Sequence, residues 1–474
     1  MVFNTFQFVW TLPIVFILYY CLMYFFKKSS SQLQIGNAFL LITSYILYIH
    51  WRPVSVLFLL YVTAITYVFA IILNRRRKKW ILWTGIILTI IPLLFIKYSG
   101  FINEAIRDTL SLIGVTLNTS TTSFILPLGL SFFTFQALGY LADSYNQKVE
   151  VEKNWWNYML FVGFFPQIAS GPINRANQLL PQIKNKRIFN SAQAIQGLKW
   201  ILWGMFMKVV MADRIGLFVD TIFNNYQHQS GLSCILGTLL FSFQIYGDFA
   251  GYSFMALGVG ELFGFEMINN FRRPYLAASV TEFWHRWHIS LSFWLRDYIY
   301  IPLGGSRCSK IKNYRNIFIT FLVSGIWHGA NWTFIFWGAL HGILQVIEKA
   351  LRLQKVDSIG VYRIVRILFT FFLINVTWIF FKLPTIFDSF KFISRIITNH
   401  DHALATITPA MTVFIALSIL IVIVKDLMDE YLNKSYSFLH NRYTIVRWGT
   451  CITLLVMILL CGVFDASQFI YVSF

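Results

Sequence analysis

Apolar runs of about the length needed to cross a lipid bilayer recur from one end of the chain to the other. A transmembrane helix needs ~20 consecutive apolar residues, because lipid offers no water to bond its backbone. Apolar residues make up 57% of the 474 residues, and charged residues only 12%. This composition excludes a soluble globular enzyme, a disordered chain and a coiled coil. It predicts an all-α polytopic membrane protein.

The expected spans follow from the apolar runs and the polar residues that end them. They are residues 6–26, 35–51, 54–74, 80–98, 124–142, 194–222, 232–264, 316–347, 362–382, 407–425 and 444–463. The run 124–142 contains Pro127 and Gly129, which predicts a kinked or partly re-entrant helix. The run 316–347 is long enough for one tilted helix or for two shorter pieces. A polar stretch, 103–123, is expected outside the helices.

Two segments do not fit a simple crossing. Residues 155–173 are apolar but are interrupted by Pro166, Gly171 and Pro172, and both flanking loops have cytoplasmic character. We therefore expect this segment to dip into the membrane and return, wrapped by other helices. Residues 265–315 combine aromatic residues with many arginines and lysines, so they are too polar to span. They predict amphipathic interfacial helices on the cytoplasmic side.

The basic residues place the chain in a membrane rather than on nucleic acid. The net charge is +19, but Lys and Arg occupy short loops between apolar runs, as in cytoplasmic loops of membrane proteins. No basic residue precedes Lys27, so the first run is expected to be a retained anchor in the cytoplasmic membrane. Because no long polar linker divides the chain, we predict one membrane domain, 1–474. Its parts are N-terminal helices 1–115, a core 124–347, and C-terminal helices with a tail, 362–474.

The cysteine and histidine spacing gives no sign of a disulfide framework or a metal site. The cysteines are scattered, without a C-x-x-C pair: Cys21, Cys234, Cys308, Cys451 and Cys461. His285 and His288 have the i, i+3 spacing of a metal pair, but no third ligand completes a convincing set. We expect no metal.

Polar residues within apolar segments carry the functional information, because each is expensive in lipid. His328 lies midway along an apolar run between Gly325 and Gly329, where small residues allow a ligand or another backbone to approach. A neutral imidazole there could remove a proton from a hydroxyl or thiol. The alternative is a histidine bonded to a neighbouring helix. His341 follows thirteen residues later, and we interpret it as a structural or tunnel-lining residue.

Four further residues are candidates for lining or supporting a site. Asp248 is a carboxylate inside an apolar run, expected either to pair with an arginine or hydroxyls or to line the site. Trp327 and Asn331 flank His328 in sequence, and His285 precedes His288.

Several motifs, in this order and spacing, resemble the membrane-bound O-acyltransferase (MBOAT) family, in particular its bacterial alginate O-acetyltransferase-like branch. They are LPLGLSFFTFQ (126–136), FPQ (165–167), SGP (170–172), DFAGYS (248–253), NFRRPY (270–275), FWHRWHISLS (283–292), YIPLGG (300–305) and WHG (327–329).

The resemblance implies a ring-like bundle of about eleven helices with a thinned centre, reached from the cytoplasm by an acyl thioester. It implies a catalytic histidine at His328 and a second functional histidine or supporting polar residue at His288. It also implies that acetyl-CoA is the donor, with no bound cofactor. The acetyl group would cross the membrane to a cell-envelope or exported polysaccharide, through an extracytoplasmic acetyltransferase partner. Membrane lipids are expected neighbours.

The aromatic C-terminal tail also resembles this branch. In it, Tyr471 is a candidate acyl relay, with an interfacial aromatic anchor as the alternative. Two other functions stay open: a transporter or flippase of an acyl or lipid-linked substrate, and a structural subunit of an envelope complex. We find no inverted repeats, the usual sign of a secondary transporter.

Overall fold

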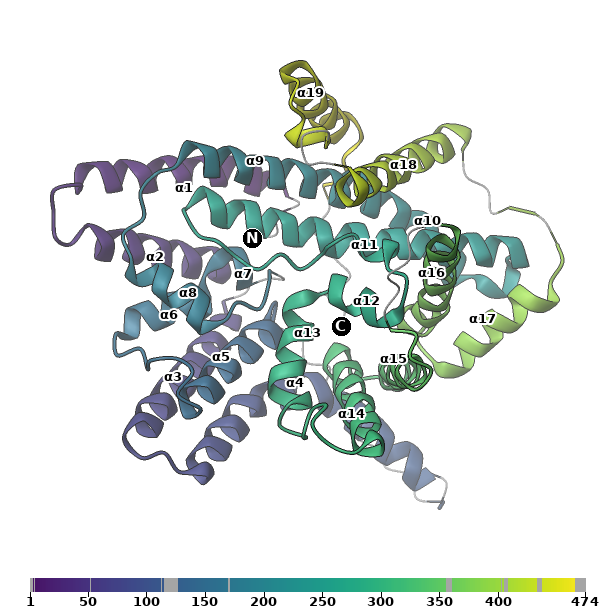
Figure 1. The fold of residues 1–474 in the computed structure, drawn as a ribbon, viewed down its shortest axis with the longest axis horizontal. Coiled ribbons are helices and arrows are strands. Elements are labelled where there is room, and N and C mark those ends of the chain that lie inside the picture. Colours follow the sequence, from purple (N-terminus) through teal and green to yellow (C-terminus); the bar gives the residue numbers. More distant parts are fainter. Residues whose placement is uncertain are drawn as a thin grey trace. The chain divides into compact units, whose positions relative to one another are not determined.

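The computed structural model describes residues 3, 5–51, 53–111, 113–114, 127–168, 171–354, 360–401, 403–404, 408–432 and 437–464. These residues form helices joined by loops, with no strand among them, so the all-α prediction is confirmed. They divide into two compact units (Figure 1). The first lies within residues 1–194 and 260–268, and the second within 195–259 and 269–474.

Eight helices of the described ranges are long and apolar enough to cross a membrane, which makes the chain a multi-pass membrane protein. They are α1 (Phe6–Phe25), α2 (Gln32–Trp51), α3 (Ser55–Arg75), α4 (Lys79–Ser111), α11 (Gly231–Leu262), α16 (Val361–Lys382), α18 (Pro409–Tyr431) and α19 (Thr444–Cys461). Each overlaps a span expected from the sequence. The ring of about eleven helices stays a prediction.

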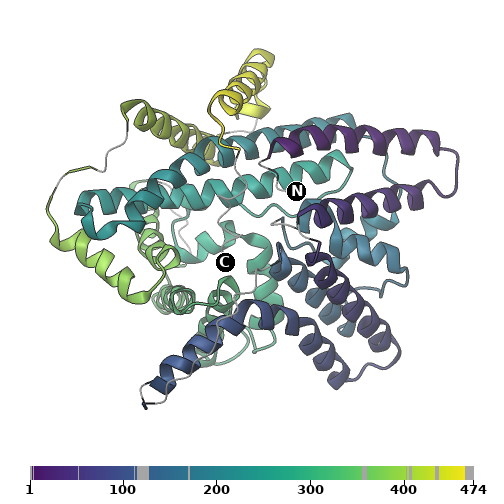
Figure 2. The ribbon, with the colours of Figure 1, turned by 180° about the vertical axis from the view of Figure 1, so that it is seen from behind.

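In the first unit, neighbouring helices pair along their lengths. Helix α1 lies beside α2, and α3 lies beside both α4 and α5 (Leu130–Tyr145), as Figures 1 and 2 show. The prediction that α4 ends near residue 98 is wrong, because the helix continues to Ser111. Its last part contains good helix formers such as Glu104 and Arg107, so it extends past the apolar segment without a breaker at its end.

The segment 155–173 is broken into pieces too short to span. Helix α6 (Trp155–Gly163) has 9 residues, which gives about 14 Å of rise against ~30 Å of hydrocarbon. Helix α7 (Phe165–Ile168) follows the break, and α8 (Ala176–Lys184) comes after it.

Polar side chains satisfy the backbone at this break. The carbonyl of Phe161 accepts hydrogen bonds from Gln136 Nε2 at 2.8 Å and from Gln167 Nε2 at 2.6 Å. The Phe165 N–H donates to Ser44 Oγ at 3.1 Å. Glutamine and serine side chains thus replace helical hydrogen bonds that the break removes, as backbone away from water requires.

The second unit contains α11 and the remaining helices. Helix α9 (Ser191–Met205), the π-helical turn η1 (Phe206–Ala212) and α10 (Asp213–Asn224) run on from one another, as predicted for 194–222. The others are α12 (Val280–Arg286), α13 (Ile289–Leu295), α14 (Lys310–His328), α15 (Trp332–Ala350) and α17 (Ile386–Thr398). Shorter turns are η2 (Tyr226–His228), η3 (Pro274–Leu276), η4 (Arg296–Tyr300) and η6 (Phe438–His440). Only short helices occupy 265–309, whereas the last residues of the expected segment, 310–315, belong to α14. The interfacial position of 265–315 stays a prediction.

The run 316–347 consists of two helices, α14 and α15, which pack closely against each other (Figure 1). Of the two alternatives that the sequence left open, the broken pair is the one that forms. A Cβ added to Gly338 would lie 2.5 Å from the Phe321 carbonyl oxygen, and one added to Gly325 would lie 2.3 Å from that of Phe334. Only glycine permits this backbone contact.

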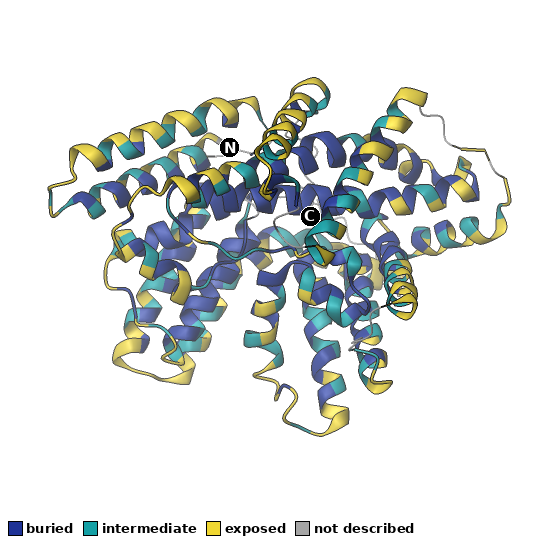
Figure 3. Ribbon diagram, turned by 45° about the horizontal axis from the view of Figure 1, so that its top comes forward, coloured by how far each residue is buried: buried dark blue, intermediate teal, exposed yellow. Residues whose placement is uncertain are grey.

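Exposed apolar side chains follow the outer faces of the spanning helices (Figure 3). Helix α1 exposes Trp10, Ile14 and Ile17, whereas most of α11 is buried. Apolar residues facing outward are expected where the surrounding solvent is lipid. Helix α11 therefore supplies interior positions for polar residues of the second unit.

We expect Gly338→Val to destabilise the α14–α15 pair, because the added side chain would overlap the Phe321 carbonyl. Overpacking of this kind costs about 1–3 kcal/mol or more, so the apparent melting temperature in detergent should fall by roughly 5 °C. Gly449→Ala is the matched control, because a Cβ there meets no atom within 4 Å. Equal melting temperatures for both variants would contradict the close contact.

Candidate active site

His328 is the last residue of α14 and lies at the break before α15. Its side chain is buried among aromatic rings. The imidazole centroid lies 5.0 Å from Trp327, 5.0 Å from Trp337 and 5.5 Å from Phe381. The end of one helix and the face of the next thus hold this histidine within an aromatic enclosure.

His288 reaches the same enclosure from the turn before α13. Its backbone is left-handed, with φ of 44°, which is uncommon for a residue with a side chain. Asn270 holds the turn: its carbonyl accepts from the Ile289 N–H at 3.1 Å, and its Oδ1 accepts from the Ser290 N–H at 3.0 Å. Hydrogen bonds from the NFRRPY motif therefore fix an otherwise strained conformation.

The His288 imidazole is fully buried. It lies 4.7 Å from the Phe249 ring, edge to face, and 5.9 Å from the Trp327 ring. Trp327 therefore contacts both of the histidines, His288 and His328, that the sequence analysis identified as catalytic candidates. Burial lowers the pKa of His288 to about 3, so its imidazole is neutral at physiological pH.

His341 lies in the same group of rings, on α15. Trp337 stands between the two histidines of this helix pair, 5.0 Å from His328 and 4.7 Å from His341. The Trp284 Nε1–H donates to His341 Nδ1 at 3.2 Å. A neutral imidazole that accepts at Nδ1 carries its proton at Nε2, so His341 presents an N–H donor. The break after His328 is what allows both histidines to share one enclosure.

A cavity with about 900 Å³ of empty space lies beside this enclosure. Its lining includes the apolar rings of Trp284, Phe293 and Phe321, together with His285, Arg296 and Lys349. Trp284 both lines the cavity and bonds His341, so it separates the two spaces. Neither His288 nor His328 lines this cavity. Burial lowers the pKa of His285, although Glu282 opposes this shift. The other basic side chains of the lining are Lys349 and Arg296, and Arg296 pairs with Asp297 at 2.7 Å.

Asn331, a predicted supporting residue, has a structural contact in the break. Its Oδ1 accepts from the Thr333 N–H at 3.0 Å and caps α15, and its Nδ2 donates to the Pro384 carbonyl at 2.8 Å. These bonds fix the start of α15 and therefore the direction in which Trp337 and His341 point.

Asp248 pairs with a cation that the sequence analysis did not single out. Lys208, in the π-helical turn η1, donates from Nζ to Asp248 Oδ1 and to Asp213 Oδ1, the latter at 2.6 Å. All three side chains are buried. A Cβ on Gly251 would lie 2.7 Å from the Gly204 carbonyl oxygen at the end of α9 and 3.0 Å from the Lys208 backbone nitrogen in η1, so glycine lets α11 approach closely enough for this pairing. In the sequence, Lys208 could have been noticed as the single lysine within the apolar run 200–212, where a charged residue is costly.

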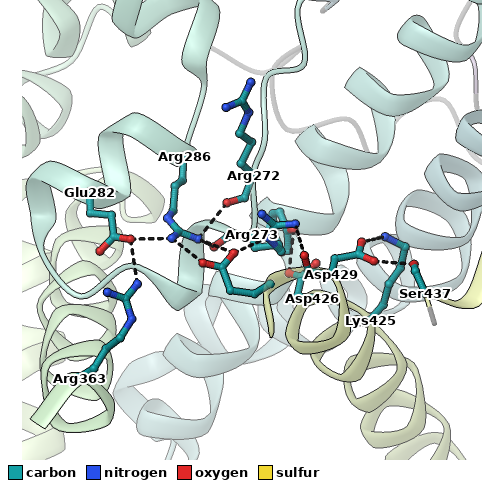
Figure 4. A network of polar contacts seen from close by, with 11 residues as sticks. Arg272, Arg273, Glu282, Arg286, Arg363, Lys425, Asp426, Asp429 and Ser437 are labelled. Atoms are coloured by element: carbon teal, nitrogen blue, oxygen red, sulfur yellow. Dashed lines mark hydrogen bonds and ion pairs between the residues drawn. The ribbon is translucent and has the colours of Figure 1, made fainter. Parts of the chain in front are cut away.

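Arg286 is the centre of a second ionic network that sequence reasoning also missed (Figure 4). It donates to Glu282 at 2.6 Å and to Glu430 of α18 at 2.8 Å. Arg273 also pairs with Glu430, and Arg363 of α16 pairs with Glu282. Burial alone would lower the pKa of Arg286, but the two carboxylates outweigh it and raise the pKa. The network fixes α12, the helix that presents Trp284 and His285.

Two further predictions concern Tyr471 and the binding of a metal ion. Tyr471, the candidate relay, lies outside the described residues. Among the residues that the structure describes, no group of three or more His, Cys, Asp or Glu side chains is arranged to hold a metal ion.

Comparison with known proteins gives one family for most of this chain. The model of "MBOAT, membrane-bound O-acyltransferase family" matches residues 2–387, which run through both units. A "Probable alginate O-acetylase" of Azotobacter vinelandii is 34% identical over 86% of this chain and 80% of its own length. A "Peptidoglycan O-acetyltransferase" of Helicobacter pylori is 33% identical, over 82% and 79%. A "Teichoic acid D-alanyltransferase" of Streptococcus thermophilus is 32% identical, over 60% and 67%.

We expect Lys208→Met to destabilise the protein by about 3–5 kcal/mol, because it leaves Asp213 and Asp248 as buried carboxylates without their cation. The triple variant Lys208→Met, Asp213→Asn and Asp248→Asn removes these charges together and should regain much of the loss. Thermal unfolding in detergent measures both. If the triple variant is no more stable than Lys208→Met alone, the buried carboxylate charges are not the cause of the destabilisation.

Proposed function

Since the chain belongs to the membrane-bound O-acyltransferase family, and is therefore an O-acyltransferase, we propose that it transfers acetyl groups for O-acetylation of a polysaccharide. The donor is a cytoplasmic thioester, acetyl-CoA, and the acceptor is a hydroxyl of a cell-envelope or exported glycan. The names of the alginate and peptidoglycan relatives support acetyl and polysaccharide as the chemical classes. The cytoplasmic membrane is the place where such a donor and such an acceptor are on opposite sides.

The single observation that carries this proposal is the enclosure around His328, which holds unpaired N–H donors. Trp337 Nε1 and His341 Nε2 are buried and have no hydrogen-bond partner among the described residues. Buried polar atoms are almost always bonded, so these two groups are suited to a substrate oxygen or a water. Trp337 lies beside the His328 ring and His341 lies beside Trp337, so both donors belong to the enclosure that holds the proposed proton acceptor.

This combination of a base and two N–H donors suits acyl transfer to a hydroxyl. His328 takes the proton of the attacking hydroxyl, whose oxygen forms a new bond to the thioester carbonyl carbon. Trp337 and His341 donate to the carbonyl oxygen as negative charge develops on it. The carbon–sulfur bond then breaks, and the leaving thiolate takes the proton back from the His328 imidazolium. His288 remains neutral and positions Trp327 against His328.

The adjoining cavity supports an approach for the donor. Arg296 and Lys349 provide basic side chains for nucleotide phosphates, and the cavity also offers aromatic surface to the narrow arm that ends in the thioester. For the acyl group to reach His328, Trp284 has to move aside, because it separates the cavity from the histidine enclosure.

Tyr471 completes the proposal as an acyl relay. Its phenol accepts the acetyl group from the thioester and forms an ester, and a second transfer to the glycan hydroxyl regenerates the phenol. The glycan transfer is assigned to an extracytoplasmic acetyltransferase partner. Splitting the reaction in this way turns one long transfer across the membrane into two short ones.

His328→Ala should reduce acetyl transfer about 100-fold or more, because a positioned general base contributes about 10²–10⁴ in rate. Consumption of acetyl-CoA by the purified protein is the measurement, with glycan acetylation in cells as the second readout. His228→Ala is the matched control, since His228 is exposed in the turn η2. Full turnover by a folded His328→Ala variant would remove this residue from the mechanism. If the wild-type protein consumed no thioester, the alternative function of a transporter or flippase would be favoured instead.

Tyr471→Phe should abolish the acetyl labelling of the C-terminal peptide that the relay predicts, because the phenol oxygen that would form the ester is absent. After incubation with isotope-labelled acetyl-CoA, mass spectrometry of the wild-type protein should find an acetyl group on Tyr471. Tyr443→Phe serves as a control for a tyrosine in an exposed position. Continued turnover with an unlabelled tail would contradict the relay and support direct transfer.

A further inference from the structure

A groove in the first unit combines an aromatic wall with a cationic end. It contains about 970 Å³ of empty space, which includes the open solvent at its mouth. Phe16, Tyr20, Tyr24 and Phe189 are aromatic residues that line it, and Tyr20 and Phe189 meet edge to face at 5.0 Å. The groove runs beside α1, whose outer face is exposed and apolar. One side of the groove is therefore suited to a hydrocarbon chain.

The other end of the groove is positively charged. Lys27, Lys186 and Arg187 all line it, and its lining contains no acidic residue. Lys27 lies two residues after the end of α1, where the helix reaches the membrane surface. A lysine at this end of a spanning helix is expected at the depth of lipid head groups, and the aromatic residues of α1 precede it along the helix.

Arg187 is a buried cation held only by neutral groups. Its guanidinium donates to the Tyr19 hydroxyl at 3.2 Å, to the Gln182 carbonyl at 2.8 Å and to Asn37 Oδ1. It also lies over the Phe265 ring, 4.4 Å from the centroid. No carboxylate of the described residues forms an ion pair with it. A buried charge without a counter-ion is costly, so an anion in the groove would stabilise it.

Gln32 provides an independent sign of a ligand. Its side chain is 6% exposed and lines the groove. Its Nε2 donates to the Met23 carbonyl at 2.6 Å, whereas its Oε1 is buried and has no hydrogen-bond partner among the described residues. The groove therefore combines a buried acceptor without a partner, Gln32 Oε1, with three basic side chains in its lining. This combination suits a ligand that carries both negative charge and an O–H or N–H donor.

From these contacts we infer that the groove binds an anionic glycerophospholipid whose head group carries a hydroxyl donor, with phosphatidylglycerol as the simplest example. The phosphodiester lies among Lys27, Lys186 and Arg187. The head-group hydroxyl donates to Gln32 Oε1, and an acyl chain follows the aromatic wall. Basic pockets on the cytoplasmic side of membrane proteins recognise lipid head groups by this chemistry. The site is separate from the histidine enclosure and does not depend on acyl transfer.

The test is lipid binding to the purified full-length protein, measured by native mass spectrometry during titration with phosphatidylglycerol or phosphatidylcholine. Lys27→Gln with Lys186→Gln should weaken phosphatidylglycerol binding about tenfold or more, because each basic residue near a lipid head group contributes severalfold. Lys78→Gln with Lys79→Gln is the matched control, since it removes the same charge from exposed positions outside the groove. Phosphatidylcholine binding should be weak in all three proteins.

Gln32→Leu tests the head-group contact without changing charge. It should weaken phosphatidylglycerol binding severalfold, and the melting temperature without added lipid checks that the variant folds. Equal losses in the two double-lysine variants would overturn the proposal, because binding would then reflect general surface charge. Displacement of the lipid by soluble glycerol phosphate at matching concentration would also overturn it, since the site would then hold a free anion rather than a lipid.

Discussion

Polar groups in this protein must find their partners within the protein, because the surrounding lipid offers none. Where helix α6 ends, the Phe161 carbonyl accepts from Gln136 and Gln167 instead of from the helix. The buried carboxylate of Asp248, on helix α11, forms an ion pair with Lys208. In both cases a specific side chain from another part of the same unit supplies the partner that the helix or the apolar surroundings lack. The same requirement makes the groove around Arg187 informative, since no carboxylate among the described residues forms an ion pair with this arginine.

Breaks in helices create the candidate active site. A continuous helix over 316–347 would place His328 and His341 more than three turns apart on one rod. The break capped by Asn331 folds α15 back along α14, and Trp337 then contacts both histidines. The left-handed turn at His288 brings a third imidazole to the other side of Trp327. Candidate catalytic residues from distant parts of the sequence meet because the backbone departs from regular helix at these points.

Sequence reasoning located the apolar segments and the residues of interest, but not their partners. Hydrophobic length is a local property, so helices such as α3 and α16 follow directly from it. The end of α4 was misjudged, because helix propensity continues beyond the apolar run. Lys208 and Glu430 were overlooked, because the role of a single charged residue cannot be inferred from the sequence until its ion-pair partner is known. His328 stood out as a polar residue within an apolar run and His288 through motif resemblance, but no local pattern connects His328 to Trp337 or His288 to Phe249.

The sequence by itself determined that this chain crosses a membrane as helices, since burial of apolar side chains and internal backbone bonding leave no other fold in lipid. Through its motifs it also determined the family. Only the tertiary structure decided which polar residues meet: Asp248 with Lys208, Arg286 with Glu430, and His328 with Trp337. Such pairings depend on which helix faces approach each other, and the packing of small and aromatic residues across many turns sets that approach.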